Sequence, residues 1–326
     1  MSGARAIGLL LGVLADGAIG GRNRSGPADG FARLARTAER KLYADRPVPG
    51  VLYAGGLTAG VVLIGLAAER VGRRSPLLRA VGTATATWAA LGGAALAADG
   101  TELARDLETG TLEAARTRLS ELDLRETAGL DTIGLSRASV EAVAENTSDV
   151  VVVPLVWGAL AGIPGVLGAR AVTVLVRTVG PPNRVALPPR HRRFGWFTAR
   201  LDEVVSLLPT RAAAALTVAA APVVGGSAAG SWRAWRRDTA AHPGPNAGRV
   251  EAAFAGALEV RLGGRTAYRH GTEELPVLGD GRNPDAGHVT RAVELSRVVG
   301  WLAGLSSAAL ALLLGPWRRR CRSPRR

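Results

Sequence analysis

The chain has 326 residues, a net charge of +14 and 47% hydrophobic residues. Cys321 is the only cysteine and the four histidines are dispersed, which excludes a disulfide framework and argues against a zinc site. Nearly all the positive charge is arginine, which suits phosphate, carboxylate and anionic membrane partners. Because no basic stripe is interleaved with aromatic residues, nucleic acid is not expected as a partner.

Uncharged runs long enough to cross a bilayer recur along the chain. They predict membrane spans near residues 6–21, 48–68, 80–98, 150–169, 204–225 and 298–317. We therefore predict an all-α, multi-pass integral membrane protein of the cell membrane, in contact with lipids. Residues 1–326 are expected to form a single membrane domain with helical soluble loops.

The first span carries Asp16, and an ionisable residue at membrane depth is costly and thus a functional candidate. A cleaved secretory leader ending near Ala18 is the alternative interpretation. In residues 22–46, apolar positions at helical spacing from Phe31 to Leu42 stand opposite arginines, which predicts an amphipathic helix.

The polar segment 99–149 predicts soluble helices at Leu103–Thr109, Leu112–Leu122 and Arg137–Asn146. Carboxyl groups follow at i, i+4 and i+8 (Glu141, Glu145 and Asp149), which stacks them on one helix face beside a charge-free run. Together with Asn146, they indicate a site for Mg²⁺ and phosphate. The alternative is an exposed, capped helix end with an Arg137–Glu141 ion pair.

The run from Val150 to Val179 is interrupted by Gly162-Ile-Pro-Gly165. It is either one broken span or a re-entrant hairpin, since Gly and Pro at that depth need other groups to satisfy the freed backbone. Asp202 and Glu203, next to Arg200, form a second carboxylate pair at a membrane edge, or merely flank the fifth helix. Arg211 lies inside an apolar stretch, which favours a phosphate or carboxylate partner.

The loop from His242 to Gly248 is rich in Pro and Gly and precedes a predicted helix at Val250–Val260. Its backbone N–H groups could approach an anion at the start of that helix, although such loops often only turn the chain. Leu262-Gly-Gly264 with Tyr268 is expected to make a second tight turn. Strand signals are nearly absent.

Taken in order, these segments resemble the CobD/CbiB family of adenosylcobinamide-phosphate (cobinamide) synthases. The resemblance runs along essentially the whole chain and is strongest in residues 124–280. The matching blocks are Arg137-Ala138 with Val140–Asp149, Pro154–Gly168, Phe194-Gly-Trp196, Ala199–Glu203, Pro209-Thr-Arg211, Pro245–Gly248, Ala255–Leu258, Leu262-Gly-Gly264 and Tyr268.

The resemblance implies a reaction in which aminopropanol, or its phosphate, is joined to the free carboxyl of the corrinoid adenosylcobyric acid. ATP and Mg²⁺ are expected to activate the acid, because a carboxylate is a poor acyl donor until phosphorylated. The expected catalytic residues are Glu141, Glu145, Asn146, Arg200 and Asp202, and the expected metal ligands are Glu145, Asp149, Asp202 and Glu203. The expected substrate and cofactor contacts are Arg125, Arg211, Pro245, Asn246, Gly248, Gly263, Gly264 and Tyr268.

The chain departs from the family pattern at several polar positions. Arg-Asp-Thr becomes Arg125-Glu-Thr127, Asn-Thr-Leu-Asp becomes Thr173-Val-Leu-Val176, and a later Asn becomes Ser206. Several of the changes delete an acidic group, so a non-catalytic paralogue that binds corrinoid is the first alternative function. A transporter, with Gly162–Gly165 as a broken helix at its binding site, is the second.

Overall fold

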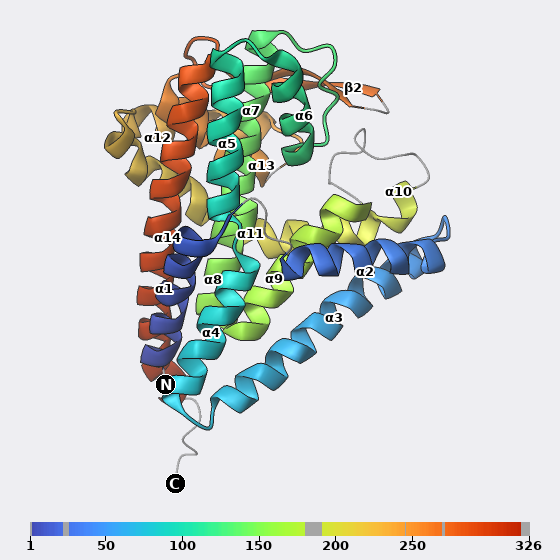
Figure 1. The fold of residues 1–326 in the computed structure, drawn as a ribbon, viewed down its shortest axis with the longest axis vertical. Helices are drawn as coiled ribbons and strands as arrows, with labels where there is room; N and C mark the ends of the chain where they lie inside the picture. The colour runs from blue at the N-terminus through green and yellow to red at the C-terminus, as the bar shows by residue number, and fades with distance from the viewer. Residues whose placement is uncertain (1, 22–25, 180–190, 245, 269–270, 321–326) are drawn as a thin grey trace.

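The computed structural model describes residues 2–21, 26–179, 191–244, 246–268 and 271–320. It is an all-α, multi-span membrane architecture with a single small sheet, as predicted. In Figure 1, the N-terminus and the end of α14 (Ala286–Arg320) lie at one end of the helical bundle, and α6 (Leu112–Leu122) and the sheet lie at the other. That residues 1–326 form one domain stays a prediction.

Within the described ranges, five helical segments are long and apolar enough to cross a membrane. They are α1 (Ser2–Ile19), α3 (Pro47–Gly72), α4 (Pro76–Ala90) continued by α5 (Gly93–Glu108), α11 (Trp196–Ala220) with the 3-10 turn Ala221–Val224, and α14. They overlap the predicted runs 6–21, 48–68, 80–98, 204–225 and 298–317. The run 150–169 differs, because it does not form one helix.

The third apolar segment breaks at Leu91-Gly92, between α4 and α5, and Asp16 of α1 lies at this break. A helix that begins at membrane depth has backbone N–H groups without intrahelical acceptors. The Asp16 carboxylate accepts the N–H of Ala94 at 3.0 Å and is itself buried. The structure thus gives the intramembrane Asp16 a structural role, as the cap of α5.

Helix α7 (Thr132–Thr147) passes through a π-helical turn (Ser148–Val152) into α8 (Val153–Ala161), which is followed by α9 (Ile163–Val179). The chain reverses between α8 and α9, because Gly158 lies against Val166, and Arg177 at the end of α9 donates to Asn146 of α7. The run is therefore a hairpin of two helices, and its re-entry into the membrane stays a prediction. The hairpin is apolar on nearly all faces because surrounding helices bury it.

The tip of the hairpin requires glycine, since Gly162 has φ 75° and ψ −148°, a conformation essentially limited to glycine. Beside it, Glu69 of α3 accepts from Arg5 of α1 at 3.1 Å, from Arg79 of α4, and from the N–H of Ile163 at 3.2 Å. The buried carboxylate therefore ties α1, α3 and α4 to the start of α9.

Helix α2 (Pro27–Leu42) confirms the predicted amphipathic helix and runs across the bundle (Figure 1). Its apolar face packs on a small core that joins α3, α9 and α10 (His191–Phe194); the core consists of Ala35, Tyr53, Ala54, Leu175, Val179 and Phe194. The Tyr53 hydroxyl donates to the Ala35 carbonyl at 3.2 Å. The basic face of α2 remains exposed.

The expectation that strands are nearly absent is wrong for residues 262–278. Strands β1 (Leu262–Tyr268) and β2 (Gly271–Leu278) pair antiparallel, with an irregularity between Leu262 and Gly264. The predicted tight turn at Gly263-Gly264 is therefore a bulge within a strand. Two glycines and Pro276 obscured the alternation that identifies strands in sequence.

Candidate functional site

A cavity of about 570 Å³ lies where α7, the end of α9, the first half of α11 and the loop before α13 (Ala247–Leu258) meet. The segment after α6 and the β hairpin close its other sides. Its volume is within the range of small-molecule binding sites. The segments that line it are far apart in sequence, so only the tertiary fold brings them together.

The described part of the lining is strongly acidic, although the chain as a whole carries a charge of +14. Among the described residues, Arg125, Arg177 and Arg200 are its arginines, and eight carboxyl groups line it, those of Asp123, Glu141, Glu145, Asp149, Asp202, Glu203, Glu251 and Glu273. The three predicted carboxyls of α7 and its π-helical extension all reach this cavity. Such an excess of acidic groups favours cations over free anions.

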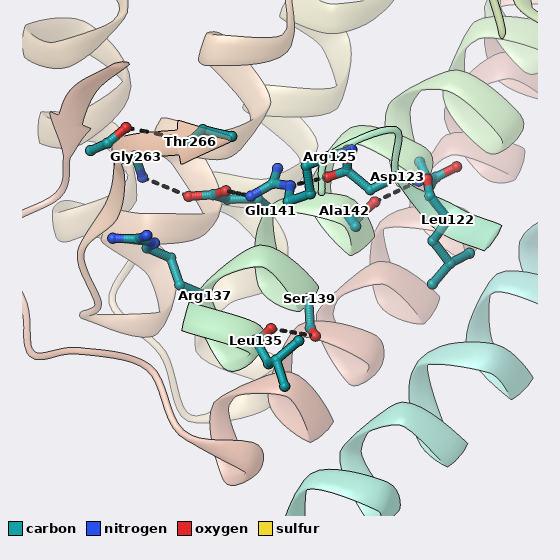
Figure 2. Close-up of polar contacts among 12 residues, drawn as sticks. Leu122, Asp123, Arg125, Leu135, Arg137, Ser139, Glu141, Ala142, Gly263 and Thr266 are labelled. Atoms are coloured by element: carbon teal, nitrogen blue, oxygen red, sulfur yellow. Dashed lines mark hydrogen bonds and ion pairs between the residues drawn. The ribbon is translucent and has the colours of Figure 1, made fainter. Parts of the chain in front are cut away.

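Glu141 holds the cavity wall together (Figure 2). It pairs with Arg125, which also pairs with Asp123, and the side chains of Arg125 and Glu141 are only 9% and 3% exposed. The other carboxylate oxygen of Glu141 accepts the N–H of Gly263 at 2.6 Å. Both oxygens are thus engaged in linking α7 to β1 and to the segment after α6.

The Arg137–Glu141 ion pair offered by the capped-helix interpretation does not form. Arg137 points instead toward β1, where its guanidinium lies 3.4 Å from the Arg265 carbonyl (Figure 2). Asn146 is outside the cavity lining; its amide nitrogen donates to the Leu122 and Ala142 carbonyls and its oxygen accepts from Arg177. Its amide therefore fastens the hairpin to α7, and a catalytic role for Asn146 remains untested.

Glu145 lies deeper in the acidic cluster. Burial, together with the carboxyl groups of Asp149 and Asp123, raises the pKa of Glu145 to about 7, whereas Arg177 opposes this effect. The π-helical turn at Ser148–Val152 lies just beyond it, and such turns are frequent at functional sites. A bound cation would relieve the repulsion among these carboxyls.

Asp202 and Glu203 line the cavity from α11. The Ser206 hydroxyl donates to Asp202 at 3.2 Å, and Arg200 pairs with Glu203. In the described part of the chain, no three carboxylate, imidazole or thiol groups lie close enough together to form a ready metal site. The metal ligands expected from sequence (Glu145, Asp149, Asp202 and Glu203) line one cavity, but their role stays a prediction.

The predicted substrate contacts divide into two groups. Asn246 and Tyr268 line the cavity, and the Asn246 amide donates to the Glu203 carbonyl at 3.0 Å. Arg125 also lines the cavity. The remaining described contacts are not part of the lining: Arg211, Gly248, Gly263 and Gly264. Arg211 donates to the Leu207 carbonyl of its own helix. Pro245 lies outside the described residues.

Sequence reasoning missed five charged or titratable side chains of the cavity: Asp123, Arg177, His242, Glu251 and Glu273. His242 begins the Pro- and Gly-rich loop, and Glu251 lies on the predicted helix after it, so their proximity to that motif was an available signal. Nothing local in the sequence marks Asp123, Arg177 or Glu273.

Comparison with known proteins identifies the family of this chain. The profile described as CobD/Cbib protein matches residues 9–296. The cobalamin biosynthesis protein CobD of Mycobacterium tuberculosis (strain ATCC 25618 / H37Rv) is 49% identical over 97% of both chains. That of Chromobacterium violaceum is 35% identical over 95% of this chain and 98% of its own. No solved structure matches. The chain belongs to the CobD/CbiB protein family.

Proposed function

We propose that this protein acts in cobalamin biosynthesis as an amide-forming synthase of the cell membrane. It would join the amine of aminopropanol, or of its phosphate, to the free carboxyl of adenosylcobyric acid. The general role in cobalamin biosynthesis is supported by the relatives named cobalamin biosynthesis protein CobD. The five long apolar helices support a multi-pass membrane location.

The acidic cavity is the observation that carries the proposal. Aliphatic amines are protonated at neutral pH, much as lysine is, and enter a site lined by carboxylates readily. The same chemistry suits a hard divalent cation, which prefers carboxylate oxygens and often uses one or two of them together with substrate phosphates. An amine substrate and Mg²⁺ thus both fit this lining.

One or two of the carboxyls of Glu145, Asp149, Asp202 and Glu203 would hold Mg²⁺, together with substrate phosphates and water. Their donor chemistry fits a hard cation, and they line the same cavity. ATP with Mg²⁺ would supply the activation of the substrate carboxyl. The arginines at the cavity, Arg177 and Arg200, would contact phosphate or carboxylate groups.

A corrinoid macrocycle with its side chains is larger than a cavity of about 570 Å³. Only the side chain with the free carboxyl would therefore enter, with the ring held at the mouth among the membrane-edge segments. Because ATP is cytoplasmic, this mouth would face the cytoplasm.

One observation favours a second function, binding of corrinoid without catalysis. Thr173, Val176 and Ser206, where the chain departs from the family pattern, all line the cavity. The altered positions therefore affect the site directly.

The test is complementation of a cobinamide-synthase-null bacterium fed cobyric acid. It is paired with an assay of purified protein containing adenosylcobyric acid, aminopropanol phosphate, ATP and a Mg²⁺ series. Growth and ATP-dependent product support the synthase, and Asp202→Asn should then raise the Mg²⁺ needed for half-maximal rate, because it removes a charged ligand. Corrinoid binding without product at any Mg²⁺ concentration would establish the second function instead.

A further inference from the structure

Of the histidines that the structure describes, His242 alone lines the cavity. Its side chain is only 7% exposed, and its Nε2 has no hydrogen-bond partner. A buried polar atom without a partner costs free energy, so it requires an explanation such as an unbound ligand or a catalytic task.

Contacts with the local backbone fix the orientation of the His242 ring. Its Nδ1 lies 2.9 Å from the Gly244 carbonyl oxygen and 3.1 Å from the Gly244 nitrogen. A Cβ at position 248 would lie 2.4 Å from the ring, so only glycine allows the start of α13 to pack against it. The Pro- and Gly-rich loop therefore serves to orient an imidazole.

Nδ1 has two competing contacts, because it accepts the Gly244 N–H in one tautomer and donates to the Gly244 carbonyl in the other. When Nδ1–H donates to the Gly244 carbonyl, Nε2 keeps its lone pair. Nε2 then lies beside Glu251, whose carboxyl oxygen is 3.6 Å away. The charged groups around the ring are acidic: Glu251 of α13, Glu141 of α7 and Glu273 of β2.

The electrostatics agree with this geometry. Burial lowers the pKa of His242, although the Gly244 contact and the charges of Glu141 and Glu273 oppose the shift. Burial, with Glu141 and Glu145, raises the pKa of Glu251 well above its usual range. At neutral pH the imidazole is thus unprotonated and able to accept a proton.

We propose that His242 is the general base of the amide-forming step and removes the proton from the amine substrate. This inference rests on the proposed function. The amine nitrogen bonds to the carbonyl carbon of the activated acyl donor, an acyl phosphate made from a nucleoside triphosphate. Nε2 takes one proton from the substrate ammonium, which frees the nitrogen lone pair for this attack. The bond from that carbon to the phosphate oxygen then breaks, its electron pair leaves with phosphate, and the phosphate carries away the second proton from nitrogen. The charges of Glu141 and Glu273 stabilise the resulting imidazolium.

The experiment uses two nucleophiles with the purified full-length protein, adenosylcobyric acid, ATP and Mg²⁺. Aminopropanol phosphate gives the amide and needs a base. Hydroxylamine traps the activated acyl group as a hydroxamate and needs none, because it is far less basic and unprotonated at neutral pH. His242→Gln should slow amide formation about 10²- to 10⁴-fold and change hydroxamate formation less than about threefold. His191→Gln, at a buried histidine bonded to Glu39 away from the cavity, is the matched control.

The pH dependence provides a second measurement. The wild-type rate of amide formation should fall on the acidic side as His242 becomes protonated, with a midpoint below about 6.5. His242→Gln should lack that limb, and free imidazole should partly rescue His242→Ala.

Equal losses of amide and hydroxamate in His242→Gln would overturn the inference and leave His242 a structural residue. An unchanged rate of amide formation would overturn it as well. Failure of the proposed function looks different, because wild-type protein would then form neither product.

Discussion

Glu141 offers the sharpest test of how the cavity wall is held, because its two carboxylate oxygens have separate buried partners. Glu141→Ala leaves the Arg125 guanidinium with Asp123 and removes the acceptor of the Gly263 N–H. Breaking a buried ion pair costs about 3–5 kcal/mol, and an unsatisfied buried N–H costs about 1–3 kcal/mol. Since the two losses share one side chain, we expect a total of at least about 3 kcal/mol.

For a chain of 326 residues, with an unfolding entropy of about 2.1 cal/mol/K per residue, about 3 kcal/mol corresponds to a fall of roughly 4–5 °C in Tm. Glu141→Gln keeps an oxygen for Gly263, so its loss should be smaller, about 1–3 kcal/mol. Thermal unfolding of the detergent-solubilised variants measures both effects. The matched control is Glu113→Ala, which removes an ion pair with Arg116 from a side chain that is 87% exposed, and should cost under about 1 kcal/mol.

The reasoning is refuted if Glu141→Ala is as stable as Glu113→Ala. The same variants also separate the structural role of Glu141 from the catalytic role expected from the family resemblance. A Glu141→Gln protein of near-normal stability that forms no product would support catalysis by this carboxyl.

Three further predictions follow from burial, backbone geometry and composition. The pKa of Glu145 is raised in the folded protein, so the folded state keeps a proton that the unfolded state releases. The Tm of the ligand-free protein should therefore fall as the pH rises from about 4.5 to about 7. Glu145→Gln should show a smaller fall in Tm over that range. Gly162→Ala should destabilise the hairpin by more than about 2 kcal/mol, because the φ and ψ of Gly162 suit glycine only and a Cβ would lie 2.7 Å from Glu69. The control Gly225→Ala, at a left-handed residue with open space around it, should cost about 1 kcal/mol. Equal Tm values for the two variants would contradict this difference. The protein should stay in the membrane fraction through high salt and alkaline carbonate, and its release by carbonate would contradict the five-span architecture.

Several features follow from local sequence alone. Charge-free runs identify the long helices because a bilayer demands about 20 apolar residues, whatever the neighbouring helices are. The helix Leu112–Leu122 and the amphipathic α2 were predictable for another local reason. The periodicity of their apolar residues indicates which face of each helix is buried. The spacing of Glu141, Glu145 and Asp149 likewise predicted that one helix face carries three carboxyls, and all three line the cavity.

The tertiary structure alone decided what those carboxyls meet. Glu141 binds Arg125 and Gly263 rather than Arg137, four residues away, because β1 packs against α7 and offers buried partners that helical spacing cannot reveal. The direction of the chain after Gly162 depended on Glu69, almost a hundred residues earlier, which accepts the N–H of Ile163. The position of His242 beside Glu251 depends on a close approach between loop and helix that glycine permits but does not specify. Helical spacing shows which side chains share a face, but several partners are then possible for each. Contacts between residues far apart in sequence decide which partner is met, so the site could be identified only from the fold.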